Sequence, residues 1–286
     1  MTIQKVGVVG CGLMGSGIAQ TAAQSGFDVV VTEVSQELLD RGVKKIHDAW
    51  AMMQSKGKLT AEQVEANKAR LHPTLEMQDF ADRDIVVEVI IEQKEPKLAL
   101  FRQLDAIVQP DALLVSNTSS LPITEMAAVT RRRDKVAGLH FFNPVPVMKL
   151  VEIVRTVETS DETVAELRAF TQAMGKTPII AKDTAGFVVN FLLIPYLLSA
   201  IRMYENGVAT MEDIDTAMQL GTNYPMGPFT LLDYVGLDTT LYAAEVIYAE
   251  NPDPAYAPPP LLRRMVTLGR LGRKTGKGFY DYSEKK

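Results

Sequence analysis

The sequence predicts an α/β fold in two domains: a doubly wound, mostly parallel sheet in residues 1–185 and an all-helical domain in residues 186–286. Three observations support this prediction. Short apolar runs alternate with helical patterns in the first part of the chain, a glycine-rich turn follows the first run, and strand signals disappear beyond Asp183. The length of 286 residues also fits two domains, because single hydrophobic cores rarely grow beyond roughly 250 to 300 residues.

Seven short apolar runs form the predicted sheet, and four amphipathic segments lie between them. The runs occupy residues 6–9, 29–31, 85–89, 113–115, 136–139, 150–154 and 178–181. The helical segments occupy residues 13–25, 36–56, 94–107 and 162–174. Strands that alternate with amphipathic helices are typical of a parallel sheet with crossover helices.

The second domain contains long helical patterns and one conspicuously apolar segment, residues 187–201. The helical patterns break at Gly207, at residues 224–228 and at residues 252–260. A transmembrane helix needs about 20 apolar residues, so the apolar segment is too short to span a bilayer. It contains Pro195 and the polar residue Asn190. We expect a buried core or subunit-interface helix and no membrane partner.

Charge and cysteine content narrow the class of protein. The net charge of −5 argues against nucleic acid as a partner, because binding to phosphate backbones relies on a basic surface. The single cysteine, Cys11, cannot form an intrachain disulfide, and the first residues lack a signal-peptide pattern, so we expect a cytoplasmic protein. No cluster of His, Cys, Asp and Glu has metal-ligand spacing, so no metal is expected.

A dinucleotide fingerprint stands between the first strand and the first helical pattern. Gly10, Gly12 and Gly15 are spaced as GxGxxG, with Leu13 and Met14 where the helical pattern begins. In this context the first glycine permits a tight turn, the second lets the backbone approach a pyrophosphate, and the third allows close packing of helix on strand. Outside this context, glycines often serve only as turns. The context predicts a Rossmann-like domain that binds a dinucleotide.

Glu33 indicates which dinucleotide binds. It follows the second predicted strand, about 20 residues after the glycine turn. A carboxylate at this position can accept hydrogen bonds from a ribose diol and would repel a 2'-phosphate. The sequence therefore predicts NAD rather than NADP as the cofactor.

His140 is the best candidate for a general base. The chain has three histidines, His47, His72 and His140, and imidazole is the usual base near neutral pH. His140 directly follows an apolar predicted strand, and active sites of open α/β sheets lie at the carboxyl ends of strands. The amide of Asn143 and the carboxylate of Glu152 follow closely. These groups beside a nicotinamide suggest alcohol and ketone chemistry, whereas the structural alternative is a core histidine capped by a backbone carbonyl.

Six segments carry a family resemblance that is more specific than the glycine turn. They read SNTSSL at 116–121, HFFNPVPVMKLVE at 140–152, GFVVN at 186–190, EDIDTAM at 212–218, YPMGP at 224–228 and GRKTGKGFYDY at 272–282. On these segments nearly the whole chain resembles the 3-hydroxyacyl-CoA dehydrogenases, specifically the short-chain 3-hydroxybutyryl-CoA type. One departure is Phe191, where many relatives have arginine.

The resemblance implies a set of catalytic residues. His140 matches the family's catalytic base, and Glu152 matches the carboxylate that orients this base and stabilises its charged form. Ser119 and Asn190 match a substrate-facing serine and asparagine, which would hydrogen-bond the reacting oxygen and stabilise developing alkoxide charge. The structural alternative for Ser119 is a helix N-cap before the helical stretch that starts near Pro122.

The resemblance also implies binding residues. Glu92 and Lys97 match positions on the ribose and nicotinamide side of NAD, and Asn117 and Asn143 match positions near the cofactor. Lys56 matches the lysine that binds coenzyme A. Structural alternatives exist for several of them: solvated charges at a helix start for Glu92 and Lys97, a basic helix end for Lys56, and a turn residue for Asn143.

The activity that the resemblance implies is reversible, NAD-dependent oxidation of a short 3-hydroxyacyl-CoA to the 3-oxoacyl-CoA, by a homodimer formed through the helical domain. Dehydrogenases of free 3-hydroxy acids are an alternative, but they usually rely on a catalytic lysine. A non-catalytic NADH-binding protein, similar to the lens lambda-crystallins, is a second alternative. The presence of His140, Glu152, Ser119 and Asn190 argues against pure binding.

Overall fold

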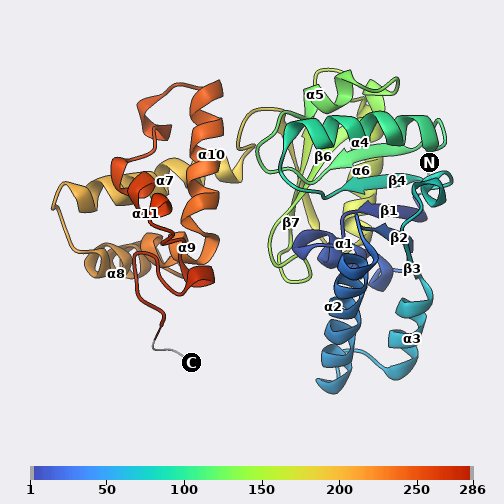
Figure 1. The fold of residues 1–286 in the computed structure, drawn as a ribbon, viewed down its shortest axis with the longest axis horizontal. Helices are drawn as coiled ribbons and strands as arrows, with labels where there is room; N and C mark the ends of the chain where they lie inside the picture. The colour runs from blue at the N-terminus through green and yellow to red at the C-terminus, as the bar shows by residue number, and fades with distance from the viewer. Residues whose placement is uncertain (1–2, 284–286) are drawn as a thin grey trace. The chain divides into compact units, whose positions relative to one another are not determined.

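The computed structural model describes residues 3–283. The chain divides between Asp183 and Thr184 into two compact units (Figure 1). The first unit is a sheet covered by helices, and the second is built from helices. The predicted fold class, a Rossmann-like sheet domain followed by a helical domain, is confirmed.

The sheet of the first unit has eight strands in the order β3-β2-β1-β4-β5-β6-β7-β8. Their bounds are β1 Lys5–Val9, β2 Asp28–Thr32, β3 Leu71–Thr74, β4 Ile85–Glu88, β5 Leu113–Ser116, β6 Val136–Phe141, β7 Leu150–Arg155 and β8 Thr177–Lys182. The strands from β3 to β6 are parallel, whereas β7 pairs with β6 in the antiparallel sense and β8 runs parallel to β7. The chain order reverses between β1 and β4, the position where open α/β sheets bind ligands.

Among the described residues of this unit, six α-helices accompany the sheet: α1 Leu13–Gln24, α2 Gln36–Ser55, α3 Ala61–Ala69, α4 Lys94–Ile107, α5 Ile123–Ala128 and α6 Asp161–Ala173. The sequence pattern misses α3 and β3. Helix α3 buries only Val64 and Asn67, so it lacks a broad apolar face, although a capping box between Thr60 and Gln63 marks its start. Strand β3 is a short edge strand that contains Pro73, a residue that sheets accept mainly at their edges.

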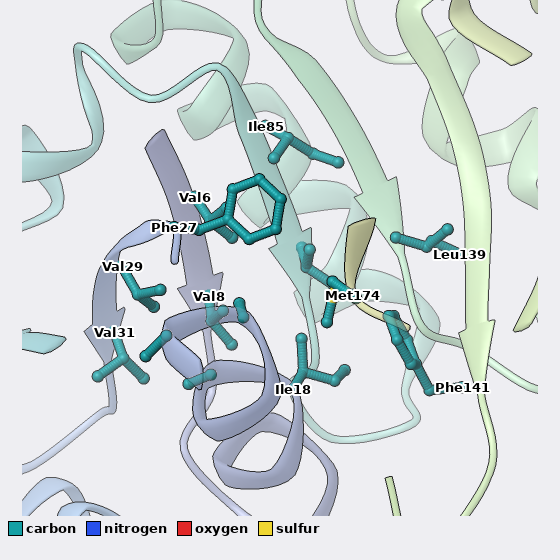
Figure 2. Packing of buried hydrophobic residues seen from close by; sticks show 14 of the residues in the cluster. Val6, Val8, Ile18, Phe27, Val29, Val31, Ile85, Leu139, Phe141 and Met174 are labelled. Atoms are coloured by element: carbon teal, nitrogen blue, oxygen red, sulfur yellow. The ribbon is translucent and has the colours of Figure 1, made fainter. Parts of the chain in front are cut away.

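An apolar cluster joins the sheet to its helices (Figure 2). Alternate residues of β1 and β2, namely Val6, Val8, Val29 and Val31, belong to this cluster together with Ile18 of α1. The cluster continues to Ile85, Leu139, Phe141 and Met174. Burial of each such side chain contributes about 1.5 to 3 kcal/mol to the free energy of folding. The cluster therefore holds in place the strands whose ends carry polar residues.

The second unit has its own apolar core and five α-helices among its described residues: α7 Val189–Glu205, α8 Met211–Thr222, α9 Pro228–Val235, α10 Leu237–Glu250 and α11 Pro260–Thr267. Helix α7, the apolar segment of the sequence, contributes Leu197, Leu198 and Ile201 to this core. Within residues 3–283, no helix combines the length and hydropathy that crossing a bilayer requires.

Pro195 lies inside α7, where it cannot donate a backbone hydrogen bond. The carbonyl that lacks this donor belongs to Phe191, and the hydroxyl of Tyr256 donates to it at 3.3 Å. The rings of Phe191 and Tyr256 also pack with their centroids 5.2 Å apart. The residue that departs from the family pattern therefore has a packing role in the second unit.

The glycine-rich tail after α11 is fastened to α9. The buried carboxylate of Asp233 accepts the backbone N–H groups of Phe279 at 2.9 Å and Tyr280 at 2.8 Å, and the hydroxyl of Tyr282 at 3.1 Å. A Cβ at Gly278 would lie 1.9 Å from this carboxylate. The tail therefore needs glycine at this position in order to reach its partner.

Candidate active site

The polar residues of the first unit gather at one edge of the sheet. The parallel strands β1, β4, β5 and β6 all end at this edge, so the segments that follow them lie together. The glycine turn follows β1, Glu88 ends β4, and His140 is the penultimate residue of β6. We name this edge of the sheet the carboxyl edge.

The glycine turn has the shape of a dinucleotide cradle. Gly10 has φ +105°, and a Cβ there would lie 2.5 Å from the carbonyl oxygen of Val89. At Gly15 a Cβ would lie 1.8 Å from the carbonyl oxygen of Gly10, whereas at Gly12 it would meet nothing within 4 Å. Packing therefore requires glycine at the first and third positions, and the second faces open space. This arrangement fits a pyrophosphate close to the backbone.

Helix α1 begins at Leu13 directly behind this cradle, and no side chain caps its first turn. Its backbone N–H groups can therefore bind a phosphate. Leu13 is exposed and Met14 is half-buried. The residues present fit a bound dinucleotide.

Glu33 follows the last residue of β2, and its carboxylate accepts the backbone N–H of Cys11 at 2.9 Å and that of Val34 at 3.0 Å. These bonds hold the carboxylate beside the glycine turn. Burial, and secondly the negative charge of Glu33, raise the pKa of the Cys11 thiol to about 12. Cys11 therefore stays a protonated core residue at neutral pH.

His140 and Glu152 are direct cross-strand partners in the antiparallel pair of β6 and β7. The Nδ1 atom of the imidazole lies 2.7 Å from Oε2 of Glu152, and both side chains are buried. The ring of Phe142 packs against the imidazole at 4.6 Å between centroids. A buried carboxylate on Nδ1 fixes the orientation of the imidazole ring.

The other two histidines have different surroundings. His47 on α2 stacks on Trp50, and burial together with the charge of Lys68 lowers its pKa. His72 lies on the edge strand β3 and is half exposed, with Nε2 2.7 Å from Asp28. Neither is at the carboxyl edge.

The loop after β5 connects neighbouring strands. The side-chain oxygen of Asn117 accepts the backbone N–H of Phe141 at 2.8 Å. The backbone N–H of Asn117 donates to the backbone carbonyl of Glu88 at 2.9 Å. Asn117 thus ties the ends of β4 and β6 to β5. Because Phe141 directly follows His140, this tie also fixes the base candidate.

Ser119 is half-buried in the same loop, and its N–H donates to Oε1 of Glu92 at 3.2 Å. It is not a helix N-cap, because the N-cap of α5 is Pro122. The backbone N–H groups of the first two residues of that helix, Ile123 and Thr124, donate instead to the carboxylate of Asp183. The structure thus removes the capping alternative for Ser119.

Lys97 and Glu92 form an ion pair and are not two separate solvated charges. The ammonium of Lys97, 1% exposed, lies 2.5 Å from Glu88 Oε1 and 3.2 Å from Glu92 Oε2. Burial opposes ionisation of Glu92, but Lys97 and the hydroxyls of Thr118 and Ser120 hold its pKa below the usual range. The sequence pattern assigns no role to Glu88. The signal that could have indicated a role for Glu88 is a charged residue within an apolar run of the sequence.

None of the contacts described above involves the remaining predicted residues. Lys56 is the exposed C-cap of α2, and Asn143 is an exposed residue that precedes Pro144 in the connection between β6 and β7. Asn190 is half-buried in the first turn of α7, in the second unit. No group of three or more metal-ligating side chains occurs in the part of the chain that the structure describes.

The sheet, the glycine turn and the carboxylate after β2 define a dinucleotide-binding protein, and comparisons specify the family. Residues 5–184 match the family model of the 3-hydroxyacyl-CoA dehydrogenase NAD binding domain, and residues 186–282 match that of the 3-hydroxyacyl-CoA dehydrogenase C-terminal domain. The chain belongs to the 3-hydroxyacyl-CoA dehydrogenase family, whose members are NAD-dependent oxidoreductases.

The sequences of individual relatives match this chain over all or nearly all of their length. The chain is 51% identical to a probable 3-hydroxybutyryl-CoA dehydrogenase of Deinococcus radiodurans, over 97% of this chain and 100% of the relative. It is 47% identical to the human mitochondrial hydroxyacyl-coenzyme A dehydrogenase, over 98% and 91%. The crystal structure of (S)-3-hydroxybutyryl-CoA dehydrogenase from Ralstonia eutropha superposes with a TM-score of 0.96 at 44% identity, over 99% and 100%.

Proposed function

We propose that this protein catalyses the reversible, NAD-dependent oxidation of a short 3-hydroxyacyl-CoA, with 3-hydroxybutyryl-CoA as the representative substrate, to the 3-oxoacyl-CoA. The observation that carries the proposal is the buried hydrogen bond between His140 and Glu152 at the carboxyl edge of a sheet with an NAD-binding turn. The names of the full-length relatives support the choice of substrate class.

His140 is the proposed general base. Oxidation of a secondary alcohol releases a proton from oxygen and a hydride from carbon. The proton goes to Nε2 of His140, the ring nitrogen that is not bonded to Glu152. Glu152 keeps the ring oriented and stabilises the imidazolium that forms. Bound NAD supplies the hydride acceptor, and the same groups return the proton in the reductive direction.

The other residues bind and orient. Ser119 and Asn190 are proposed to hydrogen-bond the reacting oxygen, and Lys56 to bind the coenzyme A part of the substrate. The proposed cofactor-binding residues are Gly10, Gly12, Leu13, Met14, Gly15, Glu33, Glu92, Lys97, Asn117 and Asn143. Glu33 would accept the ribose hydroxyls and exclude a 2'-phosphate.

We also propose a homodimer through the helical domain. Large apolar side chains of the second unit are well exposed, among them Leu192 at 68%, Val208 at 67% and Leu220 at 83%. Burial against a second copy would remove them from water. A cytoplasmic site of action is part of the proposal, supported by the single, buried cysteine.

The testing experiment follows NADH consumption by the purified protein with acetoacetyl-CoA, in parallel with acetoacetate and with NADPH. NADH turnover with the thioester alone is the expected result. Turnover of free acetoacetate would favour a hydroxy-acid dehydrogenase, and NADH binding without turnover of either would favour a binding protein. Either of these two results would overturn the proposal.

A further inference from the structure

Three charged side chains form a cluster at the carboxyl edge: the buried Glu88 and Lys97 and the partly exposed Glu92. We name this cluster the β4 charge triad. One ammonium lies between two carboxylates, 2.5 Å from Glu88 and 3.2 Å from Glu92. The triad therefore carries one unit of negative charge in excess. A low local dielectric strengthens the field of such a charge.

Hydrogen bonds fix the carboxylate of Glu88, which is fully buried. One oxygen accepts the hydroxyl of Ser116 at 2.5 Å, and the other accepts the backbone N–H of Ile90 at 2.8 Å as well as Lys97. Donors of this kind bind the charged form of a carboxylate. The donors of Lys97 face Glu88, Glu92 and the carbonyl of Ile90. Hydrogen bonds therefore hold the side chains of the triad in fixed positions.

The triad lies in the half of the sheet that should receive the nicotinamide. Dinucleotides bind across the reversal of strand order, with one mononucleotide on each half of the sheet. Glu33, the proposed partner of the adenosine ribose, follows β2 on one half, whereas β4, β5 and β6 form the other half. His140, the proposed base at the reacting carbon, belongs to β6. In this respect the inference rests on the proposed function.

The two forms of the cofactor differ in charge at the nicotinamide alone: the ring is cationic in NAD⁺ and neutral in NADH. Negative charge near the ring stabilises the oxidised form relative to the reduced form. We propose that the excess negative charge of the β4 charge triad favours binding of NAD⁺ relative to NADH. Glu88 is a positioning residue in this scheme, because it holds Lys97 and acts on the cofactor through its charge.

The test measures the dissociation constants of NAD⁺ and NADH separately, without acyl-CoA, for the wild type and for Glu88→Gln. NADH is followed by its fluorescence and NAD⁺ by calorimetry. The pyrophosphate and riboses are common to both forms, so the ratio Kd(NAD⁺)/Kd(NADH) isolates the charge of the ring. This ratio is expected to rise about three- to tenfold in Glu88→Gln.

Two control variants separate charge from geometry. Ser116→Ala removes a hydrogen bond of Glu88 but no charge, so its ratio should stay within about twofold of wild type. The double variant Glu88→Gln/Lys97→Met removes one charge of each sign and restores the net charge of the triad, so its ratio should return to the wild-type value. An equal shift in Ser116→Ala would overturn the proposal, as would an unchanged ratio in folded Glu88→Gln.

A further variant covers the case in which Glu88→Gln does not fold. Glu92 is partly exposed, and Glu92→Gln removes the same unit charge, so the ratio should move in the same direction. An unchanged ratio in that variant would overturn the inference. Wild-type protein that binds neither form would overturn the proposed function together with the inference, whereas binding of both forms with an unmoved ratio would overturn the inference alone.

Discussion

At the scale of single residues, the environment of His140 separates a catalytic from a merely structural imidazole. The core-histidine alternative expects a backbone carbonyl as the partner of the ring, yet the structure provides a fully buried carboxylate from Glu152. A buried carboxylate is costly unless it is paired. Its place beside the imidazole agrees with the proposed role of His140 as the base that takes the proton.

Replacement of His140 with Gln is expected to lower kcat with acetoacetyl-CoA by at least about a hundredfold, because proton transfer loses its base. NADH affinity should change little, since the glycine turn and Glu33 are untouched. Steady-state kinetics and NADH fluorescence titration measure the two effects. Intact turnover in this variant would show that another group removes the proton.

Replacement of Glu33 with Gln is expected to weaken the discrimination against NADPH. The amide oxygen can still accept the N–H of Cys11, so the turn keeps its bond while the repulsive charge disappears. The ratio of kcat/KM for NADH to that for NADPH should fall by about tenfold. Discrimination that stays at the wild-type level would mean that the cofactor preference has a different source.

Sequence reasoning found the residues with polar chemistry at strand ends but not the partners that hold them. Glu33 and His140 each follow an apolar run, which is a readable signal. Glu88 lies inside such a run, and its contacts come from α4 and β5, which only the folded sheet brings to it. The tie between Asn117 and Phe141 is likewise a tertiary contact between adjacent strands.

At the scale of elements, the glycine turn can be tested position by position. An alanine at Gly15 would place its Cβ 1.8 Å from the carbonyl oxygen of Gly10, so the turn must shift and stability must fall. An alanine at Gly12 meets no atom within 4 Å, and φ there is −69°, which any residue adopts. Gly15 is therefore required for packing, whereas Gly12 is expected to leave space for the ligand.

Gly15→Ala is accordingly expected to lower both the melting temperature and NADH affinity. Gly12→Ala should keep the free energy of unfolding within about 0.5 kcal/mol of wild type, while NADH affinity falls at least about tenfold because the Cβ occupies the space of the pyrophosphate. Thermal unfolding and NADH titration of both variants measure this. Normal NADH binding by Gly12→Ala would place the pyrophosphate elsewhere.

The elements that the sequence predicts correctly are those with strong apolar patterns, such as α4, whose predicted and observed bounds coincide at Lys94–Ile107. Buried strands such as β1 and β2 are equally clear, because both of their faces are covered. Strand β3 escapes prediction since its stability comes from pairing with β2 at the sheet edge, not from its own residues.

At the scale of the whole molecule, stability in acid should depend on buried ion pairs in the first unit. The carboxylate of Asp105 on α4 accepts Nε–H groups from Arg132 at 2.8 Å and Arg131 at 3.0 Å. Burial opposes its ionisation, but the hydrogen bonds and charges of these arginines lower its pKa. A carboxyl whose pKa is lower in the folded state contributes stability above its unfolded pKa, and loses it as pH falls through the folded value.

Asp105→Asn is therefore expected to destabilise the protein by about 2 to 4 kcal/mol at pH 7, and by progressively less as the pH falls below roughly 4. Urea unfolding at pH 7, 5 and 3 measures the difference from wild type. Asp111→Asn is the matched control, because the pair of Asp111 with Lys135 is exposed on the carboxylate side and should matter little. A pH-independent difference would assign the effect of Asp105 to packing.

The reversal of strand direction at β7 makes the candidate catalytic pair insensitive to the path of the chain between its members. His140 and Glu152 face each other across an antiparallel ladder, so backbone hydrogen bonds set their separation. Their separation therefore does not depend on the path of the connection at residues 142–149, although that connection contains Phe142, which packs on the imidazole, and the buried Val145. A slip of the ladder by one residue, in contrast, would move the carboxylate to the opposite face of the sheet. The imidazole and the carboxylate are thus kept on one face of the sheet by the register of two strands.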